Sequence, residues 1–468
     1  MGVHIVFATA EFAPLVTVGG LAPATAGLVG ALREAGITVD VLIPDYGPDV
    51  VTPSHGGAVD RSHGVHLDVP QWAGPAIVHT MVDPVAGEIH LVDVPGMTRS
   101  HPYLQPDGEG WRDNSERFLR FSRAVAAWVD RCSPDLVHLN DWHTAAAAAA
   151  INADVPLVLS LHNAAFHGAT SGEWCAEIGP RGNHYEWWGG TNPLTGGIAL
   201  ADVVVAVSPN HAREIREPDS GFGLDELLRS RGDAVTGIVN GIDTTVWNPA
   251  SDTALAARYS ADDLSGKAVC RAAVLSEFGW PDDDALLAVA VSRLTPQKGL
   301  DLVADIDHLL GDIGIRLIVL GSGGRADEQA LLAAAERTPT NLAVRIGYDE
   351  RLAHQLFAGG DLFVMPSRFE PCGLTQLQAM AYGTVPVVTA VGGLVDTVVD
   401  LDEFPRTGTG VIAARAEAVD VVSALHRAAR RLRDRRRLAT VQRRIMRRDV
   451  SWAEPAAEYI EIYRRLVG

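Results

Sequence analysis

Short apolar runs and amphipathic stretches alternate along the whole chain. Runs of Val, Ile and Leu bounded by turn residues are typical of strands that are buried on both faces, and the stretches between them carry apolar residues at helical spacing. Residues 115–130 give the clearest helix, because Phe118, Phe121, Val125 and Trp128 recur at three- and four-residue steps. This alternation predicts an α/β protein with parallel sheets that are covered by helices on both faces.

The predicted strands fall into two groups on either side of a turn-rich connector, residues 240–249. A chain of 468 residues exceeds the usual size of one domain, so we expect a domain boundary in this connector. The predicted strands are His4–Ala8, Thr38–Ile43, Ile77–Val82, Ile89–Val92, Leu136–Leu139, Leu157–Leu161 and Val203–Val207 before it, and Leu286–Val291, Arg316–Leu320, Ala343–Ile346, Leu362–Met365 and Pro386–Thr389 after it.

The composition argues against several classes of protein. No apolar run approaches the roughly 18 residues of a membrane-spanning helix. The N-terminal sequence enters a predicted strand without the basic region of a signal peptide, so we expect a cytoplasmic protein with no membrane partner. The net charge of −19 argues against a nucleic-acid partner, which would need basic stripes. The four cysteines lie too far apart for a disulfide framework or a zinc site, and no metal is expected.

One turn of unusual composition, Pro366–Gln376, joins a predicted strand to a helical stretch. It holds two prolines, a glycine, an arginine and a glutamate, Glu370, which stands between an aromatic residue and a proline. In an open α/β sheet such a turn lies beyond the carboxyl end of a strand, where ligands bind. A helix that starts near Gly373 would direct N–H groups and its positive dipole end at an anion. The alternative, an ordinary polar turn, leaves Glu370 unexplained.

Two paired-glycine loops occupy equivalent places in the two halves of the chain. Residues 18–21 follow the first strand, residues 391–394 follow a strand of the second half, and each loop opens a helical stretch. Paired glycines allow the backbone to approach a ligand closely, and the helix that follows offers N–H groups. Two such loops at equivalent turns suggest that both domains face one cleft.

Polar residues also follow two other strands of the first half. Asp141, Trp142 and His143 end one strand, and His162 and Asn163 end another. Side chains at the carboxyl ends of parallel strands usually face a ligand. For His143, an ordinary surface histidine is an equally good explanation.

Two cations, Arg293 and Lys298, follow a strand of the second half. Together they could neutralise a developing negative charge without a metal. Only two of the 39 basic residues are lysines, the other being Lys267. A lysine retained in so arginine-rich a chain is expected to be needed as a compact ammonium.

In this order, the motifs resemble those of the bacterial glycogen and starch synthases, glycosyltransferase family five. The resemblance implies a GT-B fold, in which two Rossmann-like doubly wound domains face a deep cleft. Residues 1–245 would form the N-terminal acceptor domain, 246–450 the C-terminal donor domain, and 451–468 a last helix that crosses back to the N-terminal domain. The matching segments are 7–16, 19–21, 140–143, 161–163, 207–209, 212–215, 239–243, 292–300, 347–348, 366–376, 392–397 and 451–452, with Tyr459 and Tyr463.

The same resemblance implies a retaining, metal-independent transfer from a nucleotide-diphosphate donor, with no cofactor and with ADP, GDP and UDP all open. Arg293 and Lys298 would contact the donor phosphates and Glu370 the donor sugar. Tyr348 would pack on the base, although burial in the core explains a tyrosine there equally well. The catalytic residues implied are His162, Arg293, Lys298, Glu370 and Asp141, with no covalent nucleophile. The donor-binding residues implied are Gly19, Gly20, Tyr348, Cys372, Gly373, Leu374, Thr375, Gly392, Gly393 and Leu394.

The chain departs from the family in its first glycine loop. The synthases read Lys-x-Gly-Gly-Leu-Ala-Asp there, whereas this chain has Thr17 in place of the lysine and Pro23 in place of the aspartate. The family's Lys-Ala-Gly likewise appears as Thr195-Gly-Gly, and the preceding residues, 184–190, are unusually aromatic. We therefore expect a rewritten acceptor-facing wall. Its residues are Thr17, Pro23, Trp142, Asn163 and Thr195.

A rewritten acceptor wall beside preserved donor chemistry favours transfer of a sugar or cyclitol unit to a small carbohydrate acceptor, such as an amino sugar or an oligosaccharide. One concrete form is a pseudo-glycosyltransferase of acarbose-type aminocyclitol biosynthesis. The first alternative is a conventional glycogen or starch synthase that elongates an α-1,4-glucan from ADP- or UDP-glucose. The second is a non-catalytic carbohydrate-binding relic, against which the retention of all five catalytic residues argues.

Overall fold

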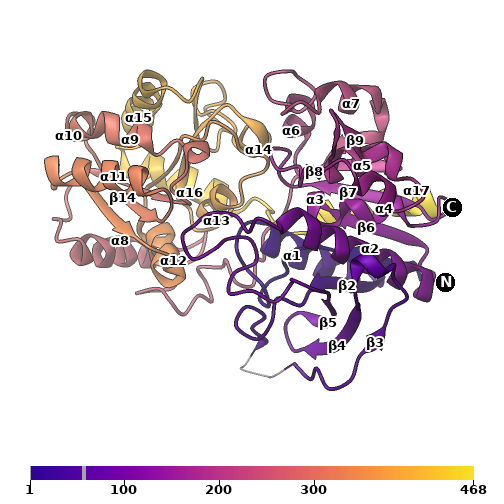
Figure 1. Ribbon diagram of the computed structural model, residues 1–468. Helices are drawn as coiled ribbons and strands as arrows, with labels where there is room; N and C mark the ends of the chain where they lie inside the picture. The colour runs from indigo at the N-terminus through magenta and orange to yellow at the C-terminus, as the bar shows by residue number, and fades with distance from the viewer. Residues whose placement is uncertain (1, 55–58) are drawn as a thin grey trace. The chain divides into compact units, whose positions relative to one another are not determined.

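The computed structural model describes residues 2–54 and 59–468. The chain forms two compact units: unit 1 comprises residues 1–241 and 452–468, and unit 2 comprises residues 242–451. The last helix, α17 (Ala453–Val467), drawn in yellow in Figure 1, therefore belongs to unit 1 with the N-terminal half of the chain. Within the described ranges, no helix is both long and apolar enough to span a membrane.

A nine-stranded sheet forms the centre of unit 1, in the order β12-β11-β7-β6-β1-β2-β5-β4-β3. Its strands are β1 His4–Ala8, β2 Thr38–Pro44, β3 Val65–His66, β4 Ile77–Asp83, β5 Gly87–Asp93, β6 Leu136–Asn140, β7 Leu157–Leu161, β11 Val203–Ala206 and β12 Val235–Gly237. The strands from β12 to β5 are parallel, but β4 pairs antiparallel with β5 and with β3. The expectation of parallel strands is wrong for β4, because the short turn 84–86 leaves no room for the dozen or so residues of a parallel crossover.

Helices connect these strands, and the longest one confirms its prediction from sequence. Helix α2 spans Asn114–Cys132 and buries Phe118, Phe121 and Val125 on one side. The other helices of unit 1 are α1 Leu21–Glu34, α3 Asp141–Ala145, α4 Trp174–Glu177, α5 Pro193–Leu200, α6 Pro209–Glu214, α7 Asp225–Ser230 and α17, with 3-10 turns at Gln71–Ala73, Ala146–Ala149, Gly182–Tyr185 and Gly232–Ala234.

Two tyrosines fix α17 to the large sheet of unit 1. The Tyr463 hydroxyl lies 2.7 Å from His138 Nδ1, and the Tyr459 hydroxyl lies 3.1 Å from Ser160 Oγ. Burial lowers the pKa of His138 to about 3, so this imidazole is neutral and acts only through hydrogen bonds. The C-terminal helix is thereby part of the core of unit 1.

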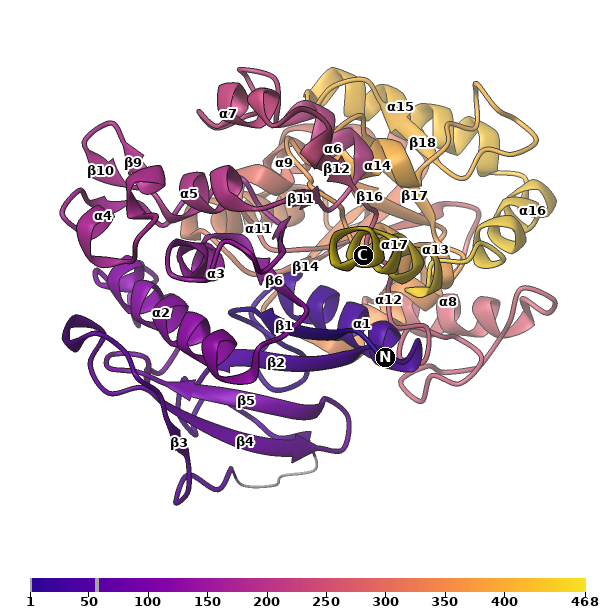
Figure 2. The same cartoon turned by 90° about the vertical axis from the view of Figure 1, so that its right-hand side faces the viewer.

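Unit 1 also contains a small antiparallel sheet between β7 and α5. Its strands are β8 (Thr170–Ser171), β9 (Glu186–Trp187) and β10 (Gly190–Thr191), in the order β8-β10-β9. Figure 2 shows β9 and β10 at the periphery of this unit, beyond α4 and α5. Strands of two residues have no measurable period, so the sequence pattern does not predict this sheet.

A six-stranded parallel sheet forms the centre of unit 2, in the order β15-β14-β13-β16-β17-β18. Its strands are β13 Leu286–Val291, β14 Ile315–Gly321, β15 Leu342–Ile346, β16 Leu362–Met365, β17 Val385–Thr389 and β18 Val411–Ala413. The helices are α8 Ser265–Glu277, α9 Asp301–Ile306, α10 Leu310–Ile313, α11 Arg325–Arg337, α12 Glu350–Gly359, α13 Thr375–Ala381, α14 Gly392–Thr397, α15 Ala418–Leu432 and α16 Arg435–Met446, with 3-10 turns at Pro296–Lys298 and Asp307–Leu309.

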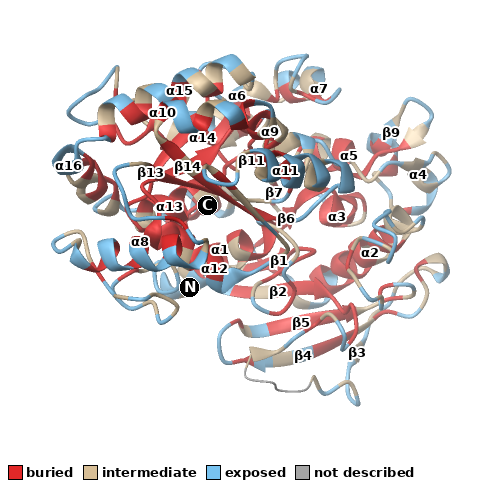
Figure 3. Ribbon diagram, turned by 90° about the vertical axis from the view of Figure 1, so that its left-hand side faces the viewer, coloured by how far each residue is buried: buried red, intermediate tan, exposed pale blue. Residues whose placement is uncertain are grey.

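The central strands of the two large sheets are buried from end to end (Figure 3). Every residue of β6, β7, β16 and β17 is buried, as expected for apolar strands that are covered on both faces. All twelve strands that the sequence predicts are present, with ends within two residues of the predicted ones. The strands β3, β12 and β18, by contrast, are too short for their patterns to stand out.

Lys267, one of the two lysines, has a structural role in unit 2. Its buried ammonium donates to the carbonyl oxygens of Ala358 and Tyr382, both at 2.9 Å, and to Thr384 Oγ1 at 3.1 Å. The two carbonyls lie at the C-terminal ends of α12 and α13, where positive charge is favourable. A compact ammonium with three donors fits this enclosed site better than a planar guanidinium.

Candidate active site

The predicted site residues lie at the points where the two large sheets reverse their strand order. In unit 2 the chain continues from β13 to β14 and β15 on one side, and to β16, β17 and β18 on the other. The sheet of unit 1 has the same arrangement about β1 and β6. Ligands of doubly wound sheets bind beyond the carboxyl ends of the strands at such switch points. The fold therefore assembles one group of candidate residues in each unit.

In unit 2, Lys298 and Glu370 meet at the switch point. Lys298 follows β13, Glu370 follows β16, and these two strands pair side by side. Lys298 Nζ lies 2.5 Å from Glu370 Oε2, and Ser367 Oγ donates to the same oxygen at 3.2 Å. Arg293 follows β13 as well, and its side chain is exposed. Because an ammonium has three donors, Lys298 retains two for an anion while it is paired with Glu370.

Backbone contacts hold the loop after β13 against the turn 366–376. The Arg368 N–H donates to the Gln297 carbonyl at 2.9 Å, and Gln297 Nε2 donates to the Phe369 carbonyl at 3.0 Å. Gly299 has a φ of +66°, and a Cβ there would lie 2.1 Å from the Pro366 carbonyl oxygen. Only glycine fits at this position, so the loop that carries Lys298 is positioned by direct contact with the turn that carries Glu370.

The second paired-glycine loop packs closely on the protein's own backbone. A Cβ on Gly392 would lie 1.9 Å from the Glu370 carbonyl oxygen, and one on Gly393 would lie 2.3 Å from the Cys372 carbonyl oxygen. The Gly393 N–H also donates to the Glu370 carbonyl at 3.0 Å. The two glycines thus allow α14 to start directly against the turn, and this contact sets the position of Glu370.

The other predicted donor-binding residues of unit 2 lie around the same turn or at the end of β15. Leu394 is fully buried in α14. Tyr348 follows β15 and is 83% exposed, which excludes the alternative of a core tyrosine. Four of the predicted residues lie in the second half of the turn 366–376, where α13 begins: Cys372, Gly373, Leu374 and Thr375.

In unit 1, Asp141 and His162 meet beyond β6 and β7. The backbone N–H of His162 donates to Asp141 Oδ1 at 2.7 Å, and that of Asn163 does so at 3.3 Å. Asp141 has a φ of +54°, a left-handed conformation that costs roughly 1–3 kcal/mol and is retained mainly at functional sites. The structure therefore brings together three of the residues predicted for this domain.

Asn140 sets the orientation of the His162 ring. His162 Nε2 lies 3.0 Å from Asn140 Oδ1, and the amide nitrogen of Asn140 donates to the Ala8 carbonyl at 3.0 Å. Nε2 therefore carries the proton, and Nδ1 is left as an acceptor. Burial lowers the pKa of His162 to about 4, so the ring is neutral near pH 7 and binds through hydrogen bonds rather than through charge.

Glu11 belongs to this group, although the sequence patterns do not single it out. Its Oε2 accepts the N–H groups of Val18 and Gly19, both at 2.8 Å, and its Oε1 accepts the Tyr103 hydroxyl at 2.8 Å. Two amide groups of the first paired-glycine loop are thus directed at an internal carboxylate. Gly20 immediately precedes α1 and is exposed. The sequence signal that could have identified Glu11 is a glutamate between apolar residues in the first strand-to-helix loop. Glu370 stands out in its own turn for the same reason.

The predicted acceptor-side residues differ widely in exposure. Thr17 is exposed, and Pro23 lies in the first turn of α1, where a missing N–H costs nothing. Trp142 stacks on His143 with ring centroids 4.1 Å apart, and both are buried, so His143 is no surface histidine. Thr195 is 4% exposed in α5, and among the described residues its hydroxyl has no hydrogen-bond partner.

Asp141 makes the stability of unit 1 depend on pH. Burial raises the pKa of its carboxyl to about 7, the charge of Glu11 acts in the same direction, and the two backbone N–H groups act against it. Because the unfolded value is about 3.9, the folded state holds the proton more tightly, and the free energy of unfolding falls as pH rises from about 4 to about 7. We expect Asp141→Asn to remove this fall, so that the variant gains stability relative to the parent between pH 4 and pH 8.

Urea denaturation at several pH values measures this difference. The exposed Asp154→Asn is a matched control, and its stability is expected to follow that of the parent at every pH. An Asp141→Asn variant whose stability changes with pH in parallel with the parent would show that Asp141 titrates normally.

Two groups of side chains among the described residues have the spacing of a metal site, His4–Asp40–Cys132 and Asp40–Glu88–His90. Both lie near the amino ends of β1, β2 and β5, which is the edge of the sheet opposite to the candidate site. His4 Nε2 lies 3.1 Å from Asp40 Oδ2, so a contact within the protein accounts for the centre of this cluster.

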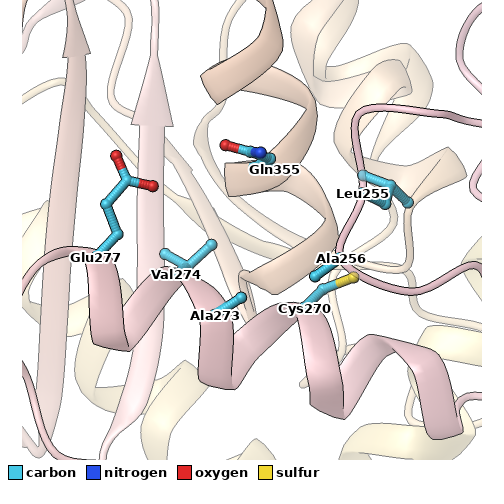
Figure 4. A pocket seen from close by; sticks show the side chains of 7 residues that line it. All are labelled: Leu255, Ala256, Cys270, Ala273, Val274, Glu277 and Gln355. Carbon is cyan, nitrogen blue, oxygen red and sulfur yellow. The ribbon is translucent and has the colours of Figure 1, made fainter.

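The pocket in Figure 4 is also separate from the candidate site. It lies in unit 2 between α8 and α12 and has a volume of about 50 Å³. Ligand pockets usually measure at least roughly 300 Å³, so this one is too small for a nucleotide. Its lining residues are Leu255, Ala256, Cys270, Ala273, Val274, Glu277 and Gln355.

Comparison with known proteins gives matches over both units. The family model described as Starch synthase catalytic domain matches residues 4–230, and Glycosyl transferases group 1 matches residues 276–442. The chain is 39% identical to the glycogen synthase of Rhodopseudomonas palustris (strain BisA53), over 98% of this chain and 96% of the relative. It is 40% identical to the glycogen synthase of Halorhodospira halophila (strain DSM 244 / SL1), over 99% of each.

Solved structures agree with these matches. The catalytic domain of starch synthase IV from Arabidopsis thaliana, bound to ADP and acarbose, matches with a TM-score of 0.89 at 29% identity over the whole of both chains. Sucrose-phosphate synthase from Thermosynechococcus elongatus, with a TM-score of 0.65 at 16% identity, shares the fold alone. The two Rossmann-like units therefore make up a GT-B fold, as expected. The names of the relatives support the alternative of a conventional synthase better than transfer to a small acceptor, and they give no support to a pseudo-glycosyltransferase or to aminocyclitol biosynthesis.

Proposed function

Because this chain belongs to the glycogen and starch synthase family of nucleotide-sugar-dependent glycosyltransferases, we propose that it transfers glucose from ADP-glucose to the end of an α-1,4-glucan. The full-length similarity to relatives named glycogen synthase supports the acceptor, and the ADP in the similar Arabidopsis structure supports the nucleotide. The observation that carries the proposal is the 2.5 Å contact of Lys298 with Glu370, because it holds an ammonium and a carboxylate at the switch point where a nucleotide-diphosphate sugar would bind.

The residues of unit 2 suit the leaving group of this reaction. Transfer breaks the bond between the anomeric carbon and a phosphate oxygen, and the departing diphosphate gains negative charge. Lys298 and Arg293 supply cations for that charge without a metal. Glu370 can accept hydroxyl groups of the sugar, and its ion pair with Lys298 holds both side chains in place before the donor arrives. The acceptor oxygen bonds to the anomeric carbon, and its proton passes to the departing phosphate.

The residues of unit 1 suit a ligand rich in hydroxyl groups. The neutral His162 ring offers Nδ1 as an acceptor. Asp141, with a pKa of about 7, is partly protonated near neutral pH and both donates and accepts hydrogen bonds. A few polar groups of this kind among buried apolar side chains are typical of sites that bind uncharged ligands.

A second function, transfer of a sugar or cyclitol unit to a small amino-bearing acceptor, is favoured by one observation. Thr17 and Thr195 are uncharged where the family pattern has lysines, while the Glu11 carboxylate lies against the loop that carries Thr17. Without the two lysines, this side of unit 1 would repel an ammonium group of the acceptor less than the family pattern would.

A screen of donors against acceptors tests both functions. The donors are ADP-, UDP-, GDP- and dTDP-glucose, the acceptors are glycogen, maltotriose and glucosamine, and mass spectrometry detects the products. We expect the glucan acceptors to be lengthened with ADP-glucose. A product on glucosamine without any lengthening of glucans would establish the second function instead.

A further inference from the structure

The small sheet of unit 1 presents two neighbouring indole rings at its outer end. Trp188, in the turn between β9 and β10, is 86% exposed, which is the largest exposure among the large apolar side chains of the described residues. The Trp187 and Trp188 rings stack with centroids 5.2 Å apart and planes at 28°. Two adjacent indole rings offer a flat apolar face on which a ligand can pack.

The turn that carries Trp188 is held rigidly. Trp188 has a φ of +49°, a conformation that bulky residues rarely adopt and that the surroundings must enforce. The Gly189 N–H donates to Glu186 Oε1 at 2.8 Å, and Thr191 Oγ1 donates to the Ser171 carbonyl at 2.7 Å. The backbone that carries the exposed indole is therefore held in a defined conformation, and the indole stacks on Trp187, which lowers the entropic cost of binding against it.

The base of the sheet is anchored in the core of unit 1. Tyr185, just before β9, is fully buried, and its hydroxyl donates to the Ala145 carbonyl at 2.7 Å. The Asn192 N–H, just after β10, donates to the Tyr185 carbonyl at 2.8 Å. Both ends of the hairpin are thus tied to the protein interior, while Trp188 remains exposed and Trp187 is half-buried.

The charge around the indoles disfavours an anionic ligand. Glu186 in β9 and Glu173, which lies between β8 and α4, are exposed, and the whole chain has a net charge of −19. A nucleic acid or an anionic membrane would be repelled. A pyranose ring has a flat face of C–H groups that packs on an indole, and it carries hydroxyl groups that the nearby carboxylates can accept.

The small sheet is continuous with predicted acceptor-side residues. The chain runs from Asn163 into β8, and from β10 into the helix that carries Thr195. Between Asn163 and β8, a Cβ on Gly168 would lie 2.0 Å from the Trp142 ring, so this segment packs tightly on Trp142. One element of unit 1 therefore bears acceptor-side residues at its base and two stacked indoles at its tip.

We propose that Trp187 and Trp188 form a platform that binds glucose units of an α-1,4-glucan away from the site of transfer. The proposal rests on the proposed function for the identity of the glucan. Long glucans would bind through the platform as well as through the site of transfer, whereas a three-unit acceptor would use the site of transfer alone. The platform would raise the local concentration of chain ends and so lower the KM for polymeric acceptors.

The test is native electrophoresis of the full chain through gels that contain glycogen, without any donor. We expect Trp188→Ala to weaken glycogen binding at least tenfold and Trp188→Phe to retain most of it. Phe404→Ala, which removes another exposed aromatic ring, is the matched control and should bind as the parent does. Equal retardation of Trp188→Ala and the parent would overturn the proposal.

Kinetics provide the second measurement. For Trp188→Ala we expect a KM for glycogen raised at least fivefold, with kcat and the rate on maltotriose within twofold of the parent. An equal loss on both acceptors would overturn the platform, because it would indicate a distorted site of transfer. A parent dimer that Trp188→Ala dissociates, with glycogen binding unchanged, would assign the indoles to a subunit interface and would also overturn it. Because the electrophoresis needs no donor, it decides the platform even where the proposed transfer fails.

Discussion

Replacing Lys298 by alanine is expected to lower kcat about 10³-fold, the largest loss predicted for any single side chain of this protein. The change removes the ammonium that would neutralise the leaving diphosphate. It also leaves the Glu370 carboxylate, now 2.5 Å from Lys298 Nζ, buried without its cation. An uncompensated buried charge is costly, so Glu370 is expected to turn away or to take up a proton, and the sugar would lose its acceptor group.

Two measurements separate this effect from general damage. Steady-state transfer gives kcat, and calorimetry with ADP gives nucleotide binding, which is expected to weaken at least tenfold. Lys298→Arg keeps the charge but not the shape and is expected to recover only part of the activity. Arg415→Ala removes an exposed cation of unit 2 and is the control that should leave both quantities unchanged. Full activity of Lys298→Ala would remove Lys298 from the mechanism, and ADP binding unaffected by it would favour a carbohydrate-binding relic.

Gly392→Ala is expected to slow transfer strongly without changing any catalytic side chain. The new Cβ would lie 1.9 Å from the Glu370 carbonyl oxygen, and the residue would have to keep a φ of +44°. The turn 366–376 and the start of α14 must separate to admit it, and Glu370 moves with the turn. We expect a loss of roughly 3 kcal/mol in stability and at least 100-fold in kcat.

Urea denaturation and steady-state kinetics on the same preparation test this prediction. Gly30→Ala is the matched control: Gly30 lies within α1, nothing is within 4 Å of its Cβ position, and the helix should gain about 0.5–1 kcal/mol. If Gly392→Ala were as stable and active as the parent, the contact of α14 with the turn would not determine the position of Glu370.

The fold follows from patterns that are local in the chain. The strands are apolar runs such as Leu157–Leu161, and their burial on both faces follows from their composition. The hydrophobic pattern does not predict the direction of a strand that a short turn determines, nor the presence of strands of only two residues. Strand β4 is antiparallel because a three-residue turn follows it, and β8, β9 and β10 are too short to show a period. Such elements form only because the surrounding fold holds them.

The site follows from the sequence only as a set of residue types at strand ends. The sequence identifies Lys298 and Glu370 separately, but only the order of the sheet brings β13 next to β16 and the two side chains to 2.5 Å. Glu11 is missed because its role depends on the folding of its own loop, which directs two amide groups at its carboxylate. For the same reason the sequence does not show that the glycines at 392 and 393 pack against backbone atoms of the turn.

The sequence by itself determines the α/β class, the two groups of strands and the family, because hydrophobic period and short motifs are properties of neighbouring residues. The tertiary structure alone decides which strand ends meet, which carboxylate accepts which amide, and which aromatic rings remain outside. Those outcomes depend on contacts between residues that are distant in the chain, and burial then sets the chemistry. The neutral His162 and the partly protonated Asp141 are consequences of burial that no local pattern records.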